Sequence, residues 1–339
     1  MILASVITFK LLLAVVLFVI TLGIAAYSTY FERKVAAFMQ DRIGPNRAGP
    51  LGLLQPIADG VKMIFKEEHR PTGSNRILFI LGPSIAMLTA LMTSAVIPWS
   101  PKYFEIGGQK YALQIADINV GILYVFGVVS LGVYGILIGG WSSNNKYSLL
   151  GAVRASSQMI SYELAMGLSI IPIILGSESL QMSAIVESQH EVWNVFKYPI
   201  GFLIFLICAF AETNRTPFDL PECETELVGG YHTEYTSMKL GFFLFSEYVN
   251  MFASSAVIST LFFGGYHFPG MSLLPAGVAV LIGIGVLFAK IIFFIFFFMW
   301  IRWTIPRFRY DQLMHLGWQV LMPLAILLVV VYGAIFSFI

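Results

Sequence analysis

Carboxylates are concentrated in residues 209–248, in a pattern that suggests proton or ligand chemistry. This stretch holds seven of the 19 acidic residues of the protein: Glu212, Asp219, Glu222, Glu224, Glu226, Glu234 and Glu247. Glu212 and Glu247 lie within apolar runs that flank the other five. A carboxylate inside a membrane-spanning run costs about 2.5–3.5 kcal/mol, so it tends to persist where it faces a polar path. We therefore expect a route for protons or for a ligand.

Two more ionisable residues lie inside apolar runs. Glu163 is close in sequence to Ser156, Ser157 and Tyr162, whose hydroxyl groups could solvate a carboxylate or only lock helix packing. Lys290 is the only base well inside a run, and it either snorkels or pairs with a buried carboxylate; we favour the pair. The candidate proton path comprises Glu163, Glu212, Glu247 and Lys290.

The composition of the 339-residue chain, 58% hydrophobic and 12% charged, indicates an all-α polytopic membrane protein. Apolar runs of about 20 residues predict about eight transmembrane helices in a single membrane domain, residues 1–339. The predicted spans are 3–31, 77–98, 118–140, 155–175, 196–213, 240–263, 276–302 and 316–337. The first run is too long for a signal-peptide core, so we expect it to be retained.

Basic residues predict the orientation of the chain. Fifteen of the 20 follow the first, third, fifth and seventh spans, so these loops are expected to be cytoplasmic and both termini outside. The cytoplasmic loops include 32–76 and an acidic loop over 214–239. In the first, Leu53, Ile57 and Val61 recur at helical spacing after a turn rich in Gly and Pro, which predicts an amphipathic interfacial helix. This helix is either a membrane-surface anchor or one wall of an opening at membrane level.

Several kinds of site are not indicated by the sequence. Cys208 and Cys223, the only cysteines, are too few for an iron–sulfur or structural zinc site, so we expect no metal. No two of the five histidines share a span at a separation suited to paired haem ligands, and no glycine-rich phosphate loop follows a strand. Glycines of the third span, such as Gly127, Gly135 and Gly139, suit close helix packing.

The seventh span ends in a compact polar corner, RWTIPRFRYDQLMHLGW. This corner is either a topology anchor or a docking face for a soluble partner, and sequence spacing does not separate the two. The arginines of the first loop either dock a partner in the same way or contact lipid headgroups. The docking candidates are Arg42, Arg47, Arg302, Arg307, Arg309 and Asp311.

Four long motifs occur in order along the chain: ERKVAAFMQDRIGPNRAGPLGLLQPIADGVKMIFKE, RASSQMISYELAMGL, AETNRTPFDLPECETELVGGYHTEY and RWTIPRFRYDQLMHLGW. Together they closely resemble the H-subunit family of proton-pumping NADH:quinone oxidoreductase, respiratory complex I. The resemblance covers essentially the whole chain. It implies an eight-span subunit at the junction of the peripheral and membrane arms, which forms much of a quinone chamber and couples quinone reduction to proton translocation.

The resemblance also implies roles for individual residues. Those that would border the quinone chamber are Glu32, Arg33, Asp59, Phe218, Glu222, Glu224 and Glu226. Glu163, Glu212 and Glu247 would begin a buried carboxylate path into the membrane arm. Some relatives carry another carboxylate in the third span, whereas residues 118–140 hold no acid here. A path at that position would have to use Tyr124, Ser130, Tyr134 or water.

By the same resemblance, quinone is the substrate, no cofactor is bound covalently, and FMN and the iron–sulfur clusters belong to partner subunits. The expected partners are the other membrane-arm and peripheral-arm subunits and membrane lipids, with no nucleic acid. We expect a bacterial plasma (inner) membrane rather than a mitochondrial or plastid membrane, although the motifs occur in all three. The alternatives are the homologous membrane subunit of a membrane-bound hydrogenase, a proton-coupled carrier, and a purely structural anchor for a soluble redox arm.

Overall fold

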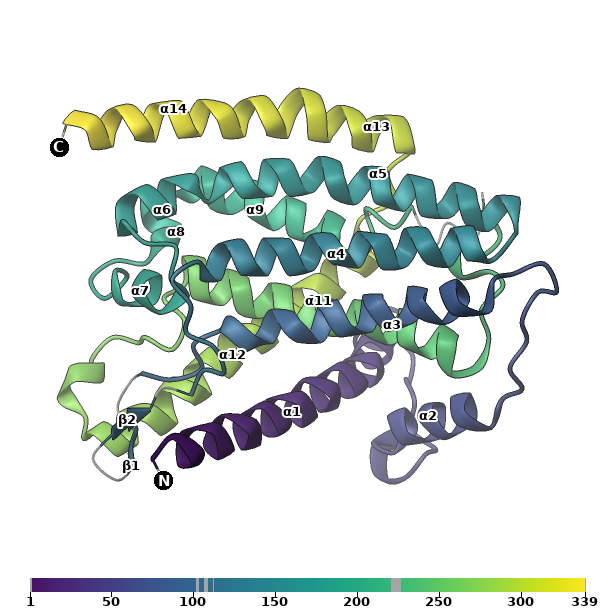
Figure 1. Cartoon of the computed structure of the whole chain (residues 1–339), viewed down its shortest axis with the longest axis horizontal. Coiled ribbons are helices and arrows are strands. Elements are labelled where there is room, and N and C mark those ends of the chain that lie inside the picture. The colour runs from purple at the N-terminus through teal and green to yellow at the C-terminus, as the bar shows by residue number, and fades with distance from the viewer. Residues whose placement is uncertain (1, 102–103, 107–108, 112, 221–226, 339) are drawn as a thin grey trace.

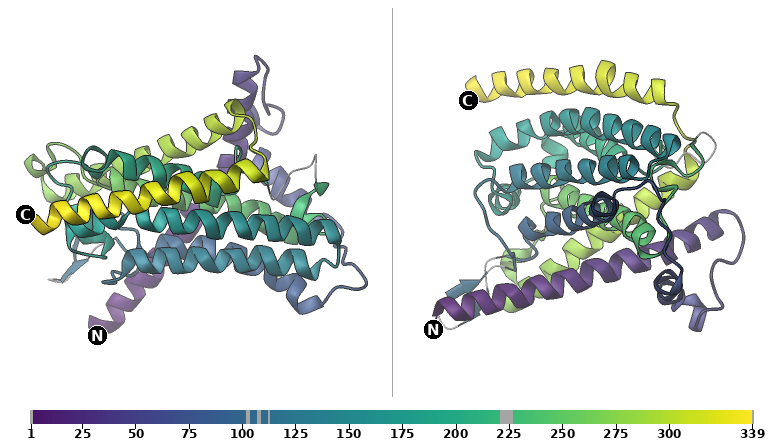
Figure 2. Two further views of the ribbon diagram at one scale, coloured as in Figure 1. Left: turned by 90° about the horizontal axis from the view of Figure 1, so that it is seen from above. Right: turned by 45° about the vertical axis from the view of Figure 1, so that its right-hand side comes forward.

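The computed structural model describes residues 2–101, 104–106, 109–111, 113–220 and 227–338. Its helices lie side by side in an elongated array, and both chain termini lie at the same end of it (Figure 1). The first long helix and the last one lie on opposite sides of the array (Figures 1 and 2). Termini at the same end require an even number of passes through the array.

Within the described residues, seven helical segments are long and apolar enough to cross a membrane. They are built from α1 (Ile2–Met39), α3 (Arg76–Met92), α4 (Gly121–Ser142), α5 (Lys146–Ser169), α11 (Ser237–Phe262), α12 (Ala276–Thr304) and a continuous segment of α13 (Tyr310–His315), a π-helix (Leu316–Leu321) and α14 (Met322–Phe338). The predicted all-α polytopic class is therefore confirmed.

The fifth of the eight predicted spans, 196–213, is shorter in the structure. A first turn, α8 (Asn194–Lys197), stops at Tyr198, whose φ of −130° and ψ of 58° are not helical. The helix then restarts as α9 (Pro199–Glu212), because proline lacks an N–H group and is best tolerated at the first helical position. The 14 residues of α9 extend about 21 Å at 1.5 Å per residue, less than the hydrocarbon thickness of about 30 Å.

The first helix, in contrast, is longer than its predicted span 3–31. It continues to Met39, so Glu32 and Arg33 lie on its last turns and not in a loop. The sequence ERKVAAFM contains good helix formers, and no Gly or Pro follows Phe31 until Gly44. Both charged side chains are therefore presented from a rigid helix.

Short elements fill the connections. They are 3₁₀ turns at Pro50–Gly52, Thr93–Val96, Gly230–His232 and Met271–Leu273, the helices α2 (Gln55–Phe65), α6 (Ile171–Ser177) and α7 (Met182–Glu187), and an antiparallel hairpin of β1 (Phe104–Ile106) and β2 (Gln109–Tyr111). The predicted turn before α2 is confirmed, and it requires glycine at Gly52. Gly52 has a φ of 82°, and an added Cβ would lie 2.2 Å from the carbonyl oxygen of Pro45.

Glycines bring α3 and α4 into close contact. A Cβ on Gly82 would lie 2.8 Å from the Cα of Gly139, and one on Gly135 would lie 2.8 Å from the backbone nitrogen of Ala86. The packing interpretation is confirmed for Gly135 and Gly139, whereas Gly127 faces open space. Bulkier residues at the contact positions would force the two helices apart.

Candidate functional site

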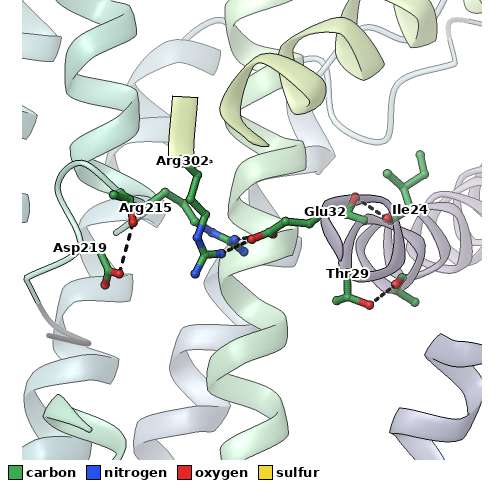
Figure 3. Close-up of polar contacts among 9 residues, drawn as sticks. Ile24, Thr29, Glu32, Arg215, Asp219 and Arg302 are labelled. Atoms are coloured by element: carbon green, nitrogen blue, oxygen red, sulfur yellow. Dashed lines mark hydrogen bonds and ion pairs between the residues drawn. The ribbon is translucent and has the colours of Figure 1, made fainter. Parts of the chain in front are cut away.

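A buried carboxylate on α1 is held between two guanidinium groups. Oε2 of Glu32 accepts a hydrogen bond from Nη1 of Arg215 at 2.8 Å, and Oε1 accepts one from Nη1 of Arg302. Figure 3 shows Glu32 reaching from its helix to both bases. Glu32 and Arg215 are only 4% and 3% exposed. One carboxylate thus pairs with two guanidinium groups at once.

Arg215, in the connection after α9, has more N–H donors than its contact with Glu32 uses. Its guanidinium lies over the ring of Tyr248, 4.1 Å from the centroid. Burial alone would lower the pKa of Arg215, but the nearby Glu32, Tyr248 and Glu247 outweigh it, so the pKa is raised and the side chain stays charged. Its Nε and Nη2 atoms are buried and have no hydrogen-bond acceptor among the described residues. Part of the hydrogen-bonding capacity of the Arg215 guanidinium group is therefore not used by the contact with Glu32.

An ion pair joins the end of α1 to α2. Nη1 of Arg33 lies 2.8 Å from Oδ2 of Asp59, while Nε2 of Gln55 donates to Oδ1 of Asp59 at 3.0 Å. The hydroxyl group of Tyr30 donates to the carbonyl oxygen of Leu51 at 2.7 Å, just before α2 begins. These contacts fix α2 relative to α1.

The other end of α2 is tied to the beginning of α11. Ser237 Oγ donates to the carbonyl oxygen of Met63 at 3.0 Å, and Thr236 Oγ1 accepts from the backbone N–H of His69 at 2.9 Å. Lys239 and Glu68 add an exposed ion pair. No residue of α2 is buried, so these polar contacts at its two ends hold it in place, apart from the main array (Figure 1).

These elements enclose a cavity of about 550 Å³, here called the outer cavity. Its walls come from α1, α2, α3, α11, the connection after α9 and the end of α12. One region is polar and is lined by Arg33, Asp59, Arg215, Glu247, Tyr248 and Arg302, whereas apolar side chains line most of the remainder. Phe18 and Phe242 in the apolar wall are 47% and 38% exposed, so the cavity reaches the surface of the chain.

A smaller space of about 50 Å³, the inner cavity, lies deeper between α3, α4, α5, α9 and α11. Glu212 and Glu247 both line it, together with the polar side chains Thr89, Thr93, Thr213, Asn214, Ser246, Asn250 and Ser254. Glu247 is 7% exposed and accepts a hydrogen bond from the Tyr231 hydroxyl group at 3.3 Å. Among the described residues, Glu247 alone borders both the inner and the outer cavity.

The carboxylates predicted for a proton path are close to this inner cavity. Oε1 of Glu212 is buried and has no hydrogen-bond donor in the described ranges. Glu163 on α5 is close enough to interact electrostatically with Glu212, and it contacts the hydroxyl group of Ser130 on α4. The third predicted span holds no acid, but its Ser130 contacts Glu163, one of the carboxylates of the predicted path. Tyr134, another candidate of this span, is 57% exposed.

The expectation that Lys290 pairs with a buried carboxylate is wrong for the part of the chain that the structure describes. Its Nζ donates to the carbonyl oxygens of Phe263, Gly265 and His267 at 2.6, 2.8 and 2.9 Å. It also lies 4.8 Å from the ring centroid of Trp193. Lys290 is satisfied because the turn that follows α11, which ends at Phe262, presents three backbone carbonyl groups to its three hydrogens.

The docking candidates divide into two groups. Arg302 points inward to Glu32 and therefore lies with the chamber residues. Arg307 pairs with the buried Asp219 at 2.9 Å. The remaining candidates are exposed at the surface: Arg42, Arg47, Arg309 and Asp311, the last two of them 3.4 Å apart.

Of the predicted chamber residues, Glu32 and Phe218 do not line the outer cavity, and three more lie outside the described residues. Phe218 is 4% exposed and packs against Tyr162 and Phe308, with ring centroids 5.4 and 5.5 Å away. Glu222, Glu224 and Glu226 lie outside the described residues. Their place at the chamber stays a prediction.

Sequence reasoning missed Arg215 and Tyr248 as site residues. Arg215 is one of two bases in the acid-rich stretch 209–248, and this imbalance was a usable indication of a paired charge. Tyr248 gave no such indication, because it is one aromatic residue among many in an apolar helix. Only the packing of α11 against the connection after α9 brings it to the guanidinium group.

Comparisons with known proteins agree on one family. The sequence model of the NADH dehydrogenase family matches residues 11–333. The chain is 60% identical over 328 residues to an H subunit of NADH-quinone oxidoreductase from Cytophaga hutchinsonii, covering 96% of each protein. It is 61% identical over 331 residues to the H subunit from Flavobacterium johnsoniae, covering 96% of this chain and 94% of the relative. It is also 50% identical over 329 residues to NADH-quinone oxidoreductase subunit 8 of Rhodothermus marinus, covering 92% and 94%.

Proposed function

Because this chain belongs to the NADH dehydrogenase family, we propose that it is the membrane subunit of an NADH:quinone oxidoreductase whose outer cavity receives the quinone. The observation that carries the proposal is the position of Glu247, which borders both cavities. A charge change on a molecule in the outer cavity would act on Glu247 directly. Glu247 would then pass the effect to the carboxylates deeper in the chain.

The outer cavity has the chemistry that a quinone headgroup needs. A quinone is a flat apolar ring with two carbonyl oxygens, and reduction adds two electrons and two protons to form two O–H bonds. The electrons would come from a partner subunit. Arg33, Arg215 and Arg302 offer positive charge and N–H donors at one end of an otherwise apolar space, which would orient the carbonyl groups and stabilise the negative charge that develops on oxygen.

The proton path that we propose runs from Glu247 across the inner cavity to Glu212 and then to Glu163. Polar side chains line the inner cavity between the first two acids. Charges interact more strongly in such a low-dielectric interior than in water, so gain or loss of a proton at one acid changes the proton affinity of the next. This arrangement would link quinone chemistry to proton movement without a redox centre in this chain.

We propose that the exposed Arg42, Arg47, Arg309 and Asp311 contact partner subunits, and that Arg307 supports this face through Asp219. This end of the array would then be cytoplasmic, with both termini on the opposite side. The relatives named above come from bacteria, which favours a bacterial plasma membrane. Lipid would surround the exposed apolar faces of α1 and α14.

The test is replacement of Glu247 or Glu212 by Gln, with quinone reduction and proton uptake measured together in membrane vesicles. We expect both activities to fall while assembly on a native gel and electron transfer to an artificial acceptor remain. Glu187→Gln on α7, an exposed acid away from both cavities, is the matched control. Unchanged quinone reduction and proton uptake in both variants would reject the proposal and favour the structural-anchor alternative. Hydrogen production in place of quinone reduction would favour the hydrogenase alternative.

A further inference from the structure

A fully buried glutamine on α5 uses both hydrogens of its amide group on backbone carbonyl groups outside its own helix. Gln158 is 0% exposed, and its Nε2 atom donates to the carbonyl oxygen of Ala211 at 2.7 Å and to that of Phe218 at 2.8 Å. Because both neighbours can only accept, the amide must present its nitrogen to them. One nitrogen atom therefore joins the two ends of residues 211–218, here called the 211–218 segment.

The 211–218 segment connects the two cavities along the chain. Glu212, near its beginning, lines the inner cavity, and Arg215, three positions later, lines the outer cavity. Asn214 between them has a φ of 51°, and its side chain also lines the inner cavity. A shift of this segment would therefore move a carboxylate of the inner cavity and an arginine of the outer cavity together.

Further contacts join the segment to α1 and to the residues after α12. Arg215 pairs with Glu32 on α1 (Figure 3), and a backbone hydrogen bond of 3.1 Å links the segment to the chain after α12. Gln158 adds a link to α5, the helix that also carries Glu163. Through this link, α5 relates the position of Glu163 to those of Glu212 and Arg215.

The end of α9 needs a donor from another element. The last carbonyl groups of a helix lack N–H partners within it, and Ala211 is buried next to the last residue of α9, Glu212. An apolar side chain in place of Gln158 would remove the donor that this carbonyl group now has. Gln158 itself borders neither cavity. It can therefore act on the chemistry of the cavities only through the 211–218 segment.

We propose that Gln158 is a positioning residue for the coupling of quinone reduction to proton transfer, because it fixes Glu212 and Arg215 relative to each other. This inference rests on the proposed function, which gives those two residues their roles. A purely structural role would be limited to holding α5 against α9. The two hydrogen bonds, one before Glu212 and one after Arg215, favour control of both cavities.

The test is Gln158→Met in the assembled enzyme, which keeps the approximate length of the side chain and removes both hydrogen bonds. We expect the KM for quinone to rise about threefold to tenfold because Arg215 shifts, and fewer protons to be taken up per quinone reduced because Glu212 shifts. Neither quantity depends on how much enzyme assembles. Wild-type values of both would overturn the proposal and leave Gln158 a structural residue.

Gln189 provides a matched control. It is also 0% exposed, and its Nε2 atom donates to the carbonyl oxygens of Ile185 on α7 and Thr260 on α11, at 3.1 and 3.0 Å. It borders neither cavity, and its Oε1 atom accepts two further hydrogen bonds. Gln189→Met should therefore reduce assembly at least as much as Gln158→Met but keep the wild-type KM and proton uptake per quinone. Equal changes of these two quantities in both variants would show a general loss of packing and overturn the proposal.

Gln158→Asn covers the case in which Gln158→Met does not assemble. Asparagine keeps the amide group but is one methylene group shorter, so it cannot reach both carbonyl oxygens without a shift of the backbone. The assembled Gln158→Asn enzyme should still show a raised KM for quinone and fewer protons taken up per quinone. Wild-type values in this enzyme would overturn the proposal.

Hydrogen exchange separates failure of this inference from failure of the proposed function. Amide hydrogens of residues 209–220 should exchange faster in assembled Gln158→Met than in the wild type, and at the wild-type rate in Gln189→Met. If Glu212→Gln and Glu247→Gln reduce both activities while Gln158→Met changes neither KM nor proton uptake, the positioning role fails and the proposed function stands. If Glu212→Gln and Glu247→Gln keep both activities, the proposed function fails. Faster exchange in Gln158→Met would then still support the link between α5 and the 211–218 segment, and unchanged exchange would overturn it.

Discussion

Glu32 and Arg215 form a buried ion pair, 2.8 Å between Oε2 and Nη1, although 183 positions separate them in the sequence. Arg302 reaches the other oxygen of the same carboxylate. One side chain on α1 thereby holds the connection after α9 and the end of α12. The position of Arg215, which also contacts Tyr248 in the outer cavity, depends on this carboxylate.

Replacing Glu32 by Gln should destabilise the protein strongly. The substitution leaves Arg215 and Arg302 close together without the carboxylate that pairs with both, and removing one partner of a buried pair costs about 3–5 kcal/mol. We expect a lower midpoint in thermal unfolding of the purified assembly and less assembled enzyme on a native gel. The control is Glu68→Gln, which breaks the exposed pair with Lys239 and should cost about 0–1 kcal/mol. Equal stability of the two variants would contradict this account.

Much of the fold could be predicted from the sequence, because a membrane-spanning helix must satisfy its backbone internally and present apolar side chains to lipid. Long apolar runs therefore mark such helices well. The break at Tyr198 could not be predicted in the same way. A proline can begin a helix or kink one, and the apolar character of 196–213 gives no reason to choose.

The candidate site could be predicted only in part. Glu163, Glu212 and Glu247 stand out because a carboxylate in an apolar run is costly, and all three are close to the inner cavity. The partners of Glu32 could not be found, since pairing over such sequence distances depends on how α1, α12 and the connection after α9 pack. Lys290 was assigned the wrong partner because spacing does not reveal the carbonyl groups that the turn after α11 presents to it.

Asp59→Asn should weaken quinone binding more than it affects stability. Arg33 is 51% exposed in its pair with Asp59, so loss of the charge should cost only about 0–1 kcal/mol of stability. The pair nevertheless fixes α2 against α1 at the polar end of the outer cavity. We expect a KM for quinone about threefold to tenfold higher with a smaller change in kcat. Lys62→Gln, exposed on the same helix and outside the cavity, should retain the wild-type KM.

Ser130→Ala should slow proton transfer. The Ser130 hydroxyl group has one proton and two neighbouring acceptors, the carbonyl oxygen of Phe126 at 2.9 Å and Oε1 of Glu163. It can therefore donate to the Glu163 carboxylate or accept from the protonated acid. We expect fewer protons taken up per quinone reduced in sealed vesicles. Ser157→Ala, which removes a hydroxyl group bonded to its own helix at Val153, is the control and should match the wild type.

His267 should make stability dependent on pH. Burial lowers the pKa of His267 to about 4 from the usual 6.5, and the nearby His190 and Lys290 add to this effect. The unfolded chain therefore binds more protons than the folded one between these two values, so stability decreases as pH falls through this window. Above about pH 6.5 this contribution is fully present. His267→Gln should flatten the decline in unfolding temperature between about pH 7 and about pH 5, whereas the exposed His315→Gln should retain the wild-type slope. An unchanged slope in His267→Gln would show that other groups cause the decline.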